Sequence, residues 1–310
     1  MQEINNFAPV LIPTLNRFEH FKRCVESLSK CTYADKTDLY IALDYPLKET
    51  HWEGYNQIKE YIENLNGFNN VFIINREKNY GAANNLFDAQ NSIFKKYDRM
   101  ILSEDDNEFS PNFLAFVNWG LEKYKDDDRI FAICGYNYPI DMSGYDKDYY
   151  FNNVFSAWGC GIWKDKWEYV QTNIFTETYL DDIFKSKTKL IKLISNKIRI
   201  IPNLKKCKND KIILGDVLIS SYLYLYDILC VFPKISKVRN WGHDGSGINC
   251  GTMTDNNIFN RQEIDNNTDF ISNTDIQVQV DKYTHAKLRK YFIIPFRTKV
   301  KIIIKLIFNL

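Results

Sequence analysis

The residues with the clearest chemical signature are three adjacent carboxylates, Glu104, Asp105 and Asp106. They directly follow the apolar stretch Met100–Leu102, which is typical of a buried strand. Three neighbouring negative charges at a strand end are unfavourable unless a cation or hydrogen-bond donors compensate them. Mg²⁺ and Mn²⁺ take oxygen ligands, and Mg²⁺ usually binds through one or two carboxylates together with substrate phosphates. The triplet therefore predicts a metal–diphosphate site, with a solvated acidic turn before a helix as the alternative.

The apolar runs of the first 135 residues predict the elements that must position these carboxylates. Strands are predicted over Ala8–Pro13, Leu39–Leu43, Val71–Ile74, Met100–Leu102 and Ile130–Cys134. Amphipathic helical patterns separate them, which predicts an α/β fold with a mostly parallel, doubly wound sheet and helices on both faces. Ligands of such sheets bind at the carboxyl ends of the strands. Polar residues also follow the other strands, namely Asn16, Arg17, Asp44, Asn75 and Arg76.

Composition limits the class of protein. The 310 residues are 45% apolar and 25% charged, which excludes disordered, collagen-like and coiled-coil classes. The net charge of +1 gives no global field that attracts nucleic acid, so no nucleic-acid partner is expected. Seven cysteines without a CxxC pair, and four scattered histidines, indicate no zinc site and favour a reduced, cytoplasmic chain. We expect neither a signal peptide nor a membrane span, because neither pattern occurs.

Basic residues are unevenly distributed along the chain. Seven Lys/Arg and no acidic residue occur from Tyr283 onward, so the first 282 residues hold 33 basic and 39 acidic side chains. The tail 283–310 mixes these cations with Ile, Leu and Phe, which predicts a basic amphipathic helix on an anionic membrane surface. A terminal helix docked on the protein's own core is the alternative. The segment 185–211 has ten Lys/Arg and one acid, and is interpreted as a basic insertion, either solvated or in contact with a diphosphate-linked lipid.

Several ordered motifs resemble bacterial glycosyltransferases of the GT-A fold, in the family 2-like group. Tyr97–Phe113 (YDRMILSEDDNEFSPNF) resembles their EDD region, which is also recognisable in the N-acetylglucosaminyltransferases that extend N-glycans. Val10–Leu28 resembles their first strand, Asn-Arg turn and helix, and Asn75–Asn84 resembles their nucleotide-side loop. The resemblance continues downstream in the motifs ICGY (133–136), SAWGCGIWKDKW (156–167) and NWGHDGSG (240–247).

This resemblance implies a nucleotide-sugar donor, with a UDP-sugar as the first expectation, and Mn²⁺ or Mg²⁺ as cofactor. Asp106 is the implied metal ligand. A metal that bridges the two phosphates neutralises charge on the leaving nucleoside diphosphate. The implied donor-binding residues are Arg17, Asp44, Gly81, Asn84, Glu104, Asp105 and Trp158. Turn or helix-cap roles and surface ion pairs remain the alternatives for the first four of them.

An inverting transfer requires a base that deprotonates the acceptor hydroxyl, and Asp216 is the candidate. It opens the apolar segment Gly215–Tyr226, where burial raises the pKa of a carboxyl, and related sequences carry an Asp at this position. A helix N-cap is the alternative role for Asp216, and Asp182 is the second candidate for the base. Related sequences often have Trp before this Asp, where this chain has Gly215.

The aromatic segment 156–167 is expected to form the floor of the sugar site. Its expected floor residues are Trp158, Gly159, Cys160, Gly161 and Trp163. Core aromatics beside a tight turn are the alternative, and Cys160 is interpreted as a small buried hydrophobe. The glycine-rich loop with His243 is expected to act as a lid over the donor. The GT-A glycosyltransferases that this chain resembles carry a histidine later in this motif, at the position of Asn249 in this chain.

The predicted organisation is one GT-A domain in two halves with a tail. Residues 1–135 are expected to bind the nucleotide-sugar, 136–282 to carry the acceptor side and the base, and 283–310 to form the tail. The predicted function is transfer of a hexosyl or N-acetylhexosaminyl unit to a glycan or lipid-linked acceptor of the cell envelope, at the inner face of the plasma membrane. The envelope glycan would be a capsule, lipopolysaccharide or exopolysaccharide.

The sequence offers two alternatives to a glycosyltransferase. A non-catalytic glycan- or nucleotide-binding homologue is one, because Gly215 and Asn249 depart from the resembled pattern. A nucleotidyltransferase is the other, but the segment Pro13–Arg17 lacks the glycine-rich phosphate loop that it would need.

Overall fold

The structure is a computed structural model that describes residues 6–247, 257–270, 272 and 275–308. The strands are β1 (Val10–Thr14), β2 (Asp38–Leu43), β3 (Asn70–Asn75), β4 (Arg99–Leu102), β5 (Asn107–Phe109), β6 (Ile130–Cys134), β7 (Tyr149–Asn152), β8 (Cys160–Trp163), β9 (Leu229–Pro233) and β10 (Val238–Asn240). The helices are α1 (Phe18–Ser29), α2 (Trp52–Glu63), α3 (Ala82–Ile93), α4 (Phe113–Lys123), α5 (Lys164–Tyr169), α6 (Glu177–Lys185), α7 (Lys187–Asn196), α8 (Ile201–Asp210), α9 (Gly215–Leu225), α10 (Lys282–Tyr291) and α11 (Phe296–Phe308). Short helical turns are η1 (Ala34–Lys36), η2 (Glu49–His51), η3 (Val170–Ile174) and η4 (Ile198–Ile200).

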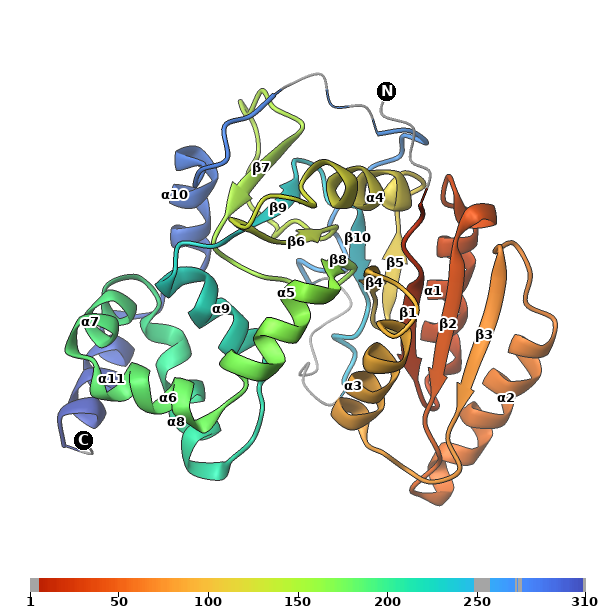
Figure 1. Cartoon of the computed structure of the whole chain (residues 1–310), viewed down its shortest axis with the longest axis horizontal. Helices are drawn as coiled ribbons and strands as arrows, with labels where there is room; N and C mark the ends of the chain where they lie inside the picture. The colour runs from red at the N-terminus through yellow and green to blue at the C-terminus, as the bar shows by residue number, and fades with distance from the viewer. Residues whose placement is uncertain (1–5, 248–256, 271, 273–274, 309–310) are drawn as a thin grey trace.

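In the described part of the chain, eight strands form one sheet in the order β3-β2-β1-β4-β8-β6-β9-β7 (Figure 1). β8 runs antiparallel to both β4 and β6, and β7 runs antiparallel to β9, while the remaining neighbours are parallel. The predicted α/β class with a mostly parallel sheet is therefore confirmed. One sheet runs through both predicted halves, because β8 is inserted between β4 and β6.

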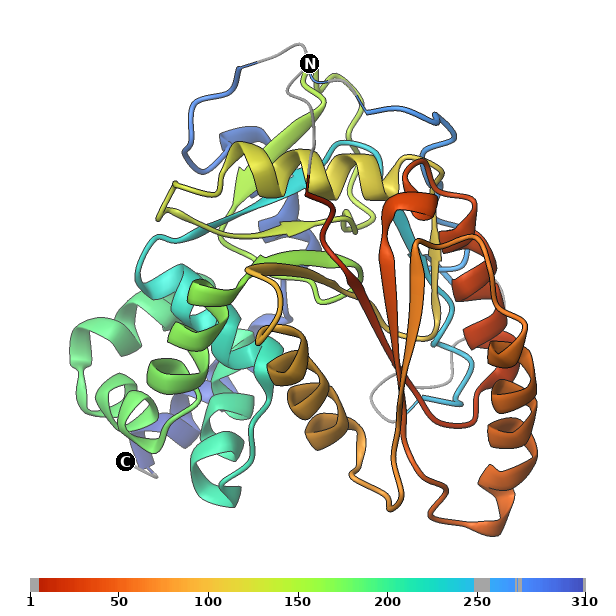
Figure 2. The ribbon, with the colours of Figure 1, turned by 45° about the vertical axis from the view of Figure 1, so that its right-hand side comes forward.

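Alternate residues of the strands feed two cores, one on each face of the sheet. Val10 and Ile12 of β1 point to the core that α1, α2 and α4 cover. Leu11 points to the opposite core, which α3 and the later helices cover. Side chains of a strand alternate between faces, so an all-apolar run such as VLI is typical of a strand buried on both sides. Figure 2 shows α1 and α2 on one side of β1–β3 and α3 on the other.

The expected sugar-site floor is wrong in part, because Gly161 and Trp163 belong to the buried strand β8. Cys160 and Trp163 are buried in the sheet, and the Trp163 indole donates a hydrogen bond to the backbone carbonyl of Leu121 in α4. A Cβ at Gly161 would lie 2.6 Å from the Val117 side chain, so this glycine is needed for packing of β8 against α4. Trp163 and Gly161 are therefore core residues, and the interpretation of Cys160 as a buried hydrophobe is confirmed.

The basic segment 185–211 is not a solvated insertion. It folds into α7, η4 and α8, which pack with α6 and α9 and bury the apolar side chains Leu190, Leu193, Ile198, Ile200, Ile201 and Leu204. We call α6, α7, η4, α8 and α11 the helical lobe (Figure 1). In this lobe α11 packs on η4, with Leu306 buried and Ile302 and Ile303 against the core. The apolar face of the tail helix is therefore used by the protein's own core, which was the alternative for this segment.

Candidate functional site

The ends of β1, β2 and β4 bring the predicted site residues to one edge of the sheet. The ladder continues one residue past the strands, since the Asp44 amide donates to the Thr14 carbonyl and the Ser103 amide donates to the Leu11 carbonyl. Parallel strands end at the same edge. Asp44 and the acidic triplet therefore lie at the same edge of the sheet, on either side of the end of β1, although they are distant in sequence.

Hydrogen bonds to one carbonyl hold the turn of the acidic triplet. The Glu104 carbonyl accepts from the Ser103 hydroxyl at 2.8 Å and from the Cys24 thiol at 3.4 Å. The Asn107 side-chain amide donates to the Ser103 hydroxyl at 3.1 Å. These bonds fix the backbone of a segment in which three carboxylates would otherwise repel one another.

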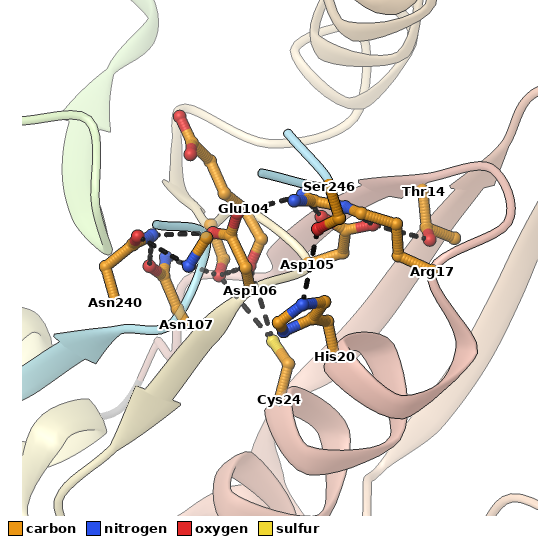
Figure 3. A network of polar contacts seen from close by, with 12 residues as sticks. Thr14, Arg17, His20, Cys24, Glu104, Asp105, Asp106, Asn107, Asn240 and Ser246 are labelled. Atoms are coloured by element: carbon orange, nitrogen blue, oxygen red, sulfur yellow. Dashed lines mark hydrogen bonds and ion pairs between the residues drawn. The ribbon is translucent and has the colours of Figure 1, made fainter. Parts of the chain in front are cut away.

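Arg17 neutralises two of the three carboxylates (Figure 3). Its guanidinium pairs with Asp105, and its Nη2 lies 2.9 Å from Asp106 Oδ2. The Thr14 hydroxyl donates to Asp105 Oδ2 at 2.9 Å, and the Asn240 amide donates to Asp106 Oδ1 at 2.6 Å. Burial alone would lower the pKa of Arg17, but the two carboxylates raise it above its usual value. Burial also raises the pKa of Asp105, and Arg17 offsets part of this effect.

The strand pair β5–β10 brings the glycine-rich loop to the carboxylates. Asn240 of β10 lies opposite Asn107 of β5, which places it beside Asp106. The Trp241 amide donates to the Asp106 carbonyl at 2.8 Å. Gly242 then packs directly on the Asp106 carboxylate, where a Cβ would overlap Oδ2 and lie 2.9 Å from Cγ. A glycine is required here because the backbone covers the carboxylate at contact distance.

Gly242→Ala is expected to destabilise the protein by about 1–3 kcal/mol, because the added methyl must displace Asp106 or the loop. Urea unfolding monitored by tryptophan fluorescence measures this change. Gly215→Ala is the matched control, since its Cβ would lie 3.7 Å from Phe175, an ordinary contact. Equal stability of the two variants would contradict the close packing of Gly242 on Asp106.

Glu104 and Asp216 are the two carboxylates of the site that the protein does not neutralise. Neither side chain forms a hydrogen bond or ion pair with a described residue, and Figure 3 shows Glu104 pointing away from the Arg17 network. Burial, followed by the charges of Asp106, Asp216 and Asp105, raises the pKa of Glu104 to about 8. Asp216 lies in the first turn of α9 and is exposed to solvent, while nearby protein atoms partly desolvate it and raise its pKa to about 6. The charge of Asp216 contributes to the raised pKa of Glu104, so the two carboxylates lie within electrostatic range of each other.

Glu104 should make stability fall with rising pH. Its folded-state pKa of about 8 is above the ordinary value of 4.5, so the native state binds the proton more tightly than the unfolded chain. Its contribution is fully present below pH 4.5 and is lost as the pH rises to about 8, with a slope of at most about 1.4 kcal/mol per pH unit. Glu104→Gln should remove this slope in urea unfolding measured with EDTA at pH 5, 6.5 and 8.

Glu122→Gln is the matched control for that experiment. Glu122 pairs with Lys125 and Arg99, and its hydrogen bonds to them lower its pKa. Its contribution is therefore constant from pH 5 to 8, and the variant should keep the slope of the wild type. A slope that is identical in the wild type and Glu104→Gln would refute the raised pKa of Glu104.

Asp44 holds the loop that precedes α3. Its carboxylate accepts hydrogen bonds from the backbone amides of Tyr45, Tyr80 and Gly81 at 2.8–2.9 Å. Gly81 has a φ of 75°, in the region that favours glycine, and open space lies where its Cβ would be. Asn84 is exposed, and its amide donates to the Tyr80 carbonyl. These contacts show a structural role for Asp44, and the open side of Gly81 leaves room for a ligand.

Trp158 and His243 form an aromatic group beside the acidic triplet. His243 is buried and stacks on Phe259 with ring centroids 4.0 Å apart, and Trp158 contacts both rings edge-on at 5.8 Å. Burial lowers the pKa of His243, and the charge of Asp106 offsets part of this effect, so the histidine is near Asp106. Trp158 is half-buried, and its role as a sugar-site residue stays a prediction. The motif position Asn249 lies outside the described residues.

The structure also bears on the alternatives for the base. Asp182 pairs with Lys189 on the surface of the helical lobe, which does not favour it as the base. Asp216 does not occupy the N-cap of α9, a position that Leu214 takes. Sequence reasoning missed Thr14, Asn240 and Gly242 as partners of the carboxylates. Asn240 and Gly242 lie in the motif NWGHDGSG, which was the available signal, whereas nothing local marks Thr14.

The carboxylates of the site fit a divalent metal ion in part. Within the described ranges, no group of three or more His, Cys, Asp or Glu side chains is placed so that it could hold a metal ion. The donor chemistry nevertheless fits, because the Asp106 carboxylate, and Glu104 when it is ionised, supply the oxygen ligands that Mg²⁺ and Mn²⁺ take. A metal at Asp106 would have to replace Arg17 on Oδ2 and would depend on substrate phosphates for further ligands.

Comparisons with known proteins give partial structural overlaps. No protein-family model matches the chain, and no curated protein sequence matches it. The crystal structure of S. aureus TarS 1–349 overlaps 55% of this chain and 50% of its own, at 13% identity and a TM-score of 0.35. Its complex with UDP-GlcNAc overlaps 42% of this chain and 34% of its own, at 16% identity and a TM-score of 0.30. The apo form of mouse xyloside xylosyltransferase 1 overlaps 57% of this chain and 74% of its own, at 10% identity and a TM-score of 0.35. The match spans half or less of the TarS chains, and overlaps this limited establish neither activity nor ligands.

Proposed function

We propose that this chain is a glycosyltransferase that moves a sugar from a nucleotide-sugar, a UDP-sugar in the first instance, to an acceptor hydroxyl. The observation that carries the proposal is the pair of free carboxylates, Glu104 and Asp216, which have raised pKa values and lie within electrostatic range of each other. Their environments separate the two pKa values to about 8 and about 6, which is the arrangement that assigns acid and base roles at neutral pH. Asp216 is then ionised and Glu104 carries a proton.

Asp216 acts as the general base in this proposal. Its carboxylate takes the proton of the acceptor hydroxyl as that oxygen attacks the anomeric carbon, which gives an inverting transfer. The neutral Glu104 donates a hydrogen bond to a hydroxyl of the donor. Trp158 offers an aromatic face to the sugar ring, and the loop that starts at Trp241 limits water around Asp106.

In this proposal Arg17 binds the diphosphate directly, and Asp106 binds it through a metal ion. Arg17 Nη1 is buried and has no hydrogen-bond partner in the described part of the chain, so it is available to a phosphate oxygen. Asp106, with Asp105 in support, would hold Mn²⁺ or Mg²⁺. The metal would supply Lewis-acid neutralisation of the charge on the departing nucleoside diphosphate. The resemblance of the EDD, NREKNYG and NWGHDGSG motifs to GT-A glycosyltransferases supports the same assignment. On the basis of this resemblance, the proposed transfer belongs to the synthesis of a cell-envelope polysaccharide.

Thermal unfolding with nucleotide-sugars tests this function. The panel consists of UDP-, GDP-, CMP- and dTDP-sugars, each with Mn²⁺ or with EDTA. A ligand at 100 times its Kd stabilises the folded state by about 2.7 kcal/mol, which raises the Tm of a chain of this size by several degrees. We expect a Mn²⁺-dependent rise with one nucleotide class. The absence of a rise with every donor would favour the non-catalytic alternative.

A further inference from the structure

Positive charge is concentrated in two segments that meet in space. Residues 185–211 and 282–310 contain 18 of the 40 Lys/Arg and one of the 39 acidic residues, so the remaining chain has 22 basic and 38 acidic side chains. Both segments come together where α11 packs on η4. The net charge of +1 thus hides a strongly basic region and an acidic body.

Part of this charge is neutralised within the helical lobe. Lysines of the lobe pair with Glu177, Asp181 and Asp182 of α6 and with Asp227 after α9. The cations at the junction of α10 and α11 differ from these. Arg199, Arg289, Lys290 and Arg297 are exposed, and none forms an ion pair with a described residue.

Two large apolar side chains project between these cations. Ile293, on the connection from α10 to α11, is 68% exposed, and Phe296, the first residue of α11, is 79% exposed. Arg289 and Lys290 lie in the last turn of α10, and Arg297 follows Phe296 in α11. We call Arg199, Arg289, Lys290, Ile293, Phe296 and Arg297 the basic corner.

Packing of Arg199 on Phe292 fixes the basic corner against the body of the protein. The Arg199 guanidinium lies 3.7 Å from the centre of the Phe292 ring. Phe292 in turn contacts Tyr138 edge-on at 5.0 Å. The connection is therefore anchored by Phe292 while its neighbours Ile293 and Phe296 remain in solvent.

We propose that the basic corner docks on an anionic phospholipid membrane, with Ile293 and Phe296 entering the interface and the four cations contacting lipid phosphates. Exposed apolar side chains gain by transfer out of water, and surrounding Lys/Arg are attracted to anionic headgroups. A nucleic acid offers phosphates but no apolar phase for Ile293 and Phe296. No helix in the described part of the chain is long and apolar enough to cross a membrane. Helix α11, with 13 residues, is about 20 Å long against a hydrocarbon core of about 30 Å.

Tyr138 contacts Phe292 beside the basic corner and also feels the charge of the proposed base. The Tyr138 hydroxyl lies within electrostatic range of both Arg199 and Asp216. A membrane at the corner would therefore bring a lipid-linked acceptor to the side of the site where Asp216 lies. This orientation rests on the proposed function, whereas docking itself does not.

Vesicle sedimentation of the full chain tests the docking. The vesicles are pure phosphatidylcholine, or phosphatidylcholine with about 30% phosphatidylglycerol as the anionic lipid, without any nucleotide-sugar. We expect binding to the anionic vesicles that is at least about tenfold tighter and is weakened by 0.5 M NaCl (a Debye length of about 4 Å). Arg289→Gln/Lys290→Gln/Arg297→Gln should weaken it by about 100-fold, at about fivefold per cation. Ile293→Ser/Phe296→Ser should weaken it about tenfold or more.

Matched variants and a competing ligand keep this test decisive. Lys30→Gln/Lys59→Gln/Lys95→Gln removes three exposed cations outside the lobe, and Ile73→Ser removes an exposed apolar side chain of β3. Both should bind vesicles as the wild type does. Equal binding to the two vesicle types, equal losses in the control variants, or corner-dependent binding of duplex DNA without vesicle binding would each overturn the proposal. Because no donor is present, its failure is separate from failure of the proposed transfer.

Discussion

Asp216→Asn is expected to lower the rate of sugar transfer by about 10²- to 10⁴-fold, the range for loss of a general base, with donor affinity unchanged. The amide is isosteric with the carboxylate but cannot accept the acceptor's proton. Asp216 makes no hydrogen bond or ion pair with a described residue, so the substitution removes no contact that holds α9. Transfer rates at saturating donor, together with calorimetric titration of the donor, separate the two effects.

The pH dependence of the wild type sharpens this test. Desolvation raises the pKa of Asp216 to about 6, and a base acts only when it is ionised. The rate should therefore rise with pH through about 6 and level off above it. Asp182→Asn is the matched control, because Asp182 pairs with Lys189 on the lobe surface. An Asp216→Asn variant with the transfer rate of this control would eliminate Asp216 as the base.

Asp106→Asn should weaken metal-dependent donor binding by about 100-fold or more, because a neutral amide is a poor ligand for Mn²⁺ or Mg²⁺. The fold should survive. The Asn oxygen can still accept from the Asn240 amide, and Arg17 keeps its pairing with Asp105. Calorimetric titration of donor with Mn²⁺ and with EDTA measures the metal-dependent part of the affinity.

Asp88→Asn provides the comparison for Asp106. Asp88 also pairs with an arginine, Arg76, at 2.6 Å, but it lies on the exposed side of α3. Its loss should leave metal-dependent affinity unchanged. An Asp106→Asn variant that keeps full Mn²⁺-dependent affinity would refute the assignment of Asp106 as the metal ligand.

Much of the sheet could be predicted from the sequence because its signals are local. The predicted strands Ala8–Pro13 and Ile130–Cys134 match β1 and β6 to within a residue or two. The placement of β8 could not be predicted this way. Its residues CGIW carry the same glycine and tryptophan content as a ligand-binding turn, and only pairing with β4 and β6 identifies them as core. The packing of segment 185–211 could not be predicted either, because its many Lys and Arg residues obscure the Leu and Ile residues at helical spacing.

The acidic triplet and Asp216 were predicted as site residues, but their protonation and pairing depend on contacts across the fold. Arg17 is expected to bind the donor, and its pairing with Asp105 and Asp106 is an additional contact that the sequence does not predict. Asn240 reaches Asp106 only because β10 pairs with β5. Such pairings are set by sheet register and loop packing, which a single sequence does not encode in any local pattern.

Release of nucleoside diphosphate from a nucleotide-sugar tests the central claim most directly. The wild type, Asp216→Asn and Asp182→Asn would be incubated with Mn²⁺, a panel of nucleotide-sugars and membrane lipid extract as acceptor source. The account predicts release with one donor class by the wild type and Asp182→Asn, and its loss in Asp216→Asn and in EDTA. Release that is equal in all three proteins, or no release with any donor, would contradict sugar transfer at this site.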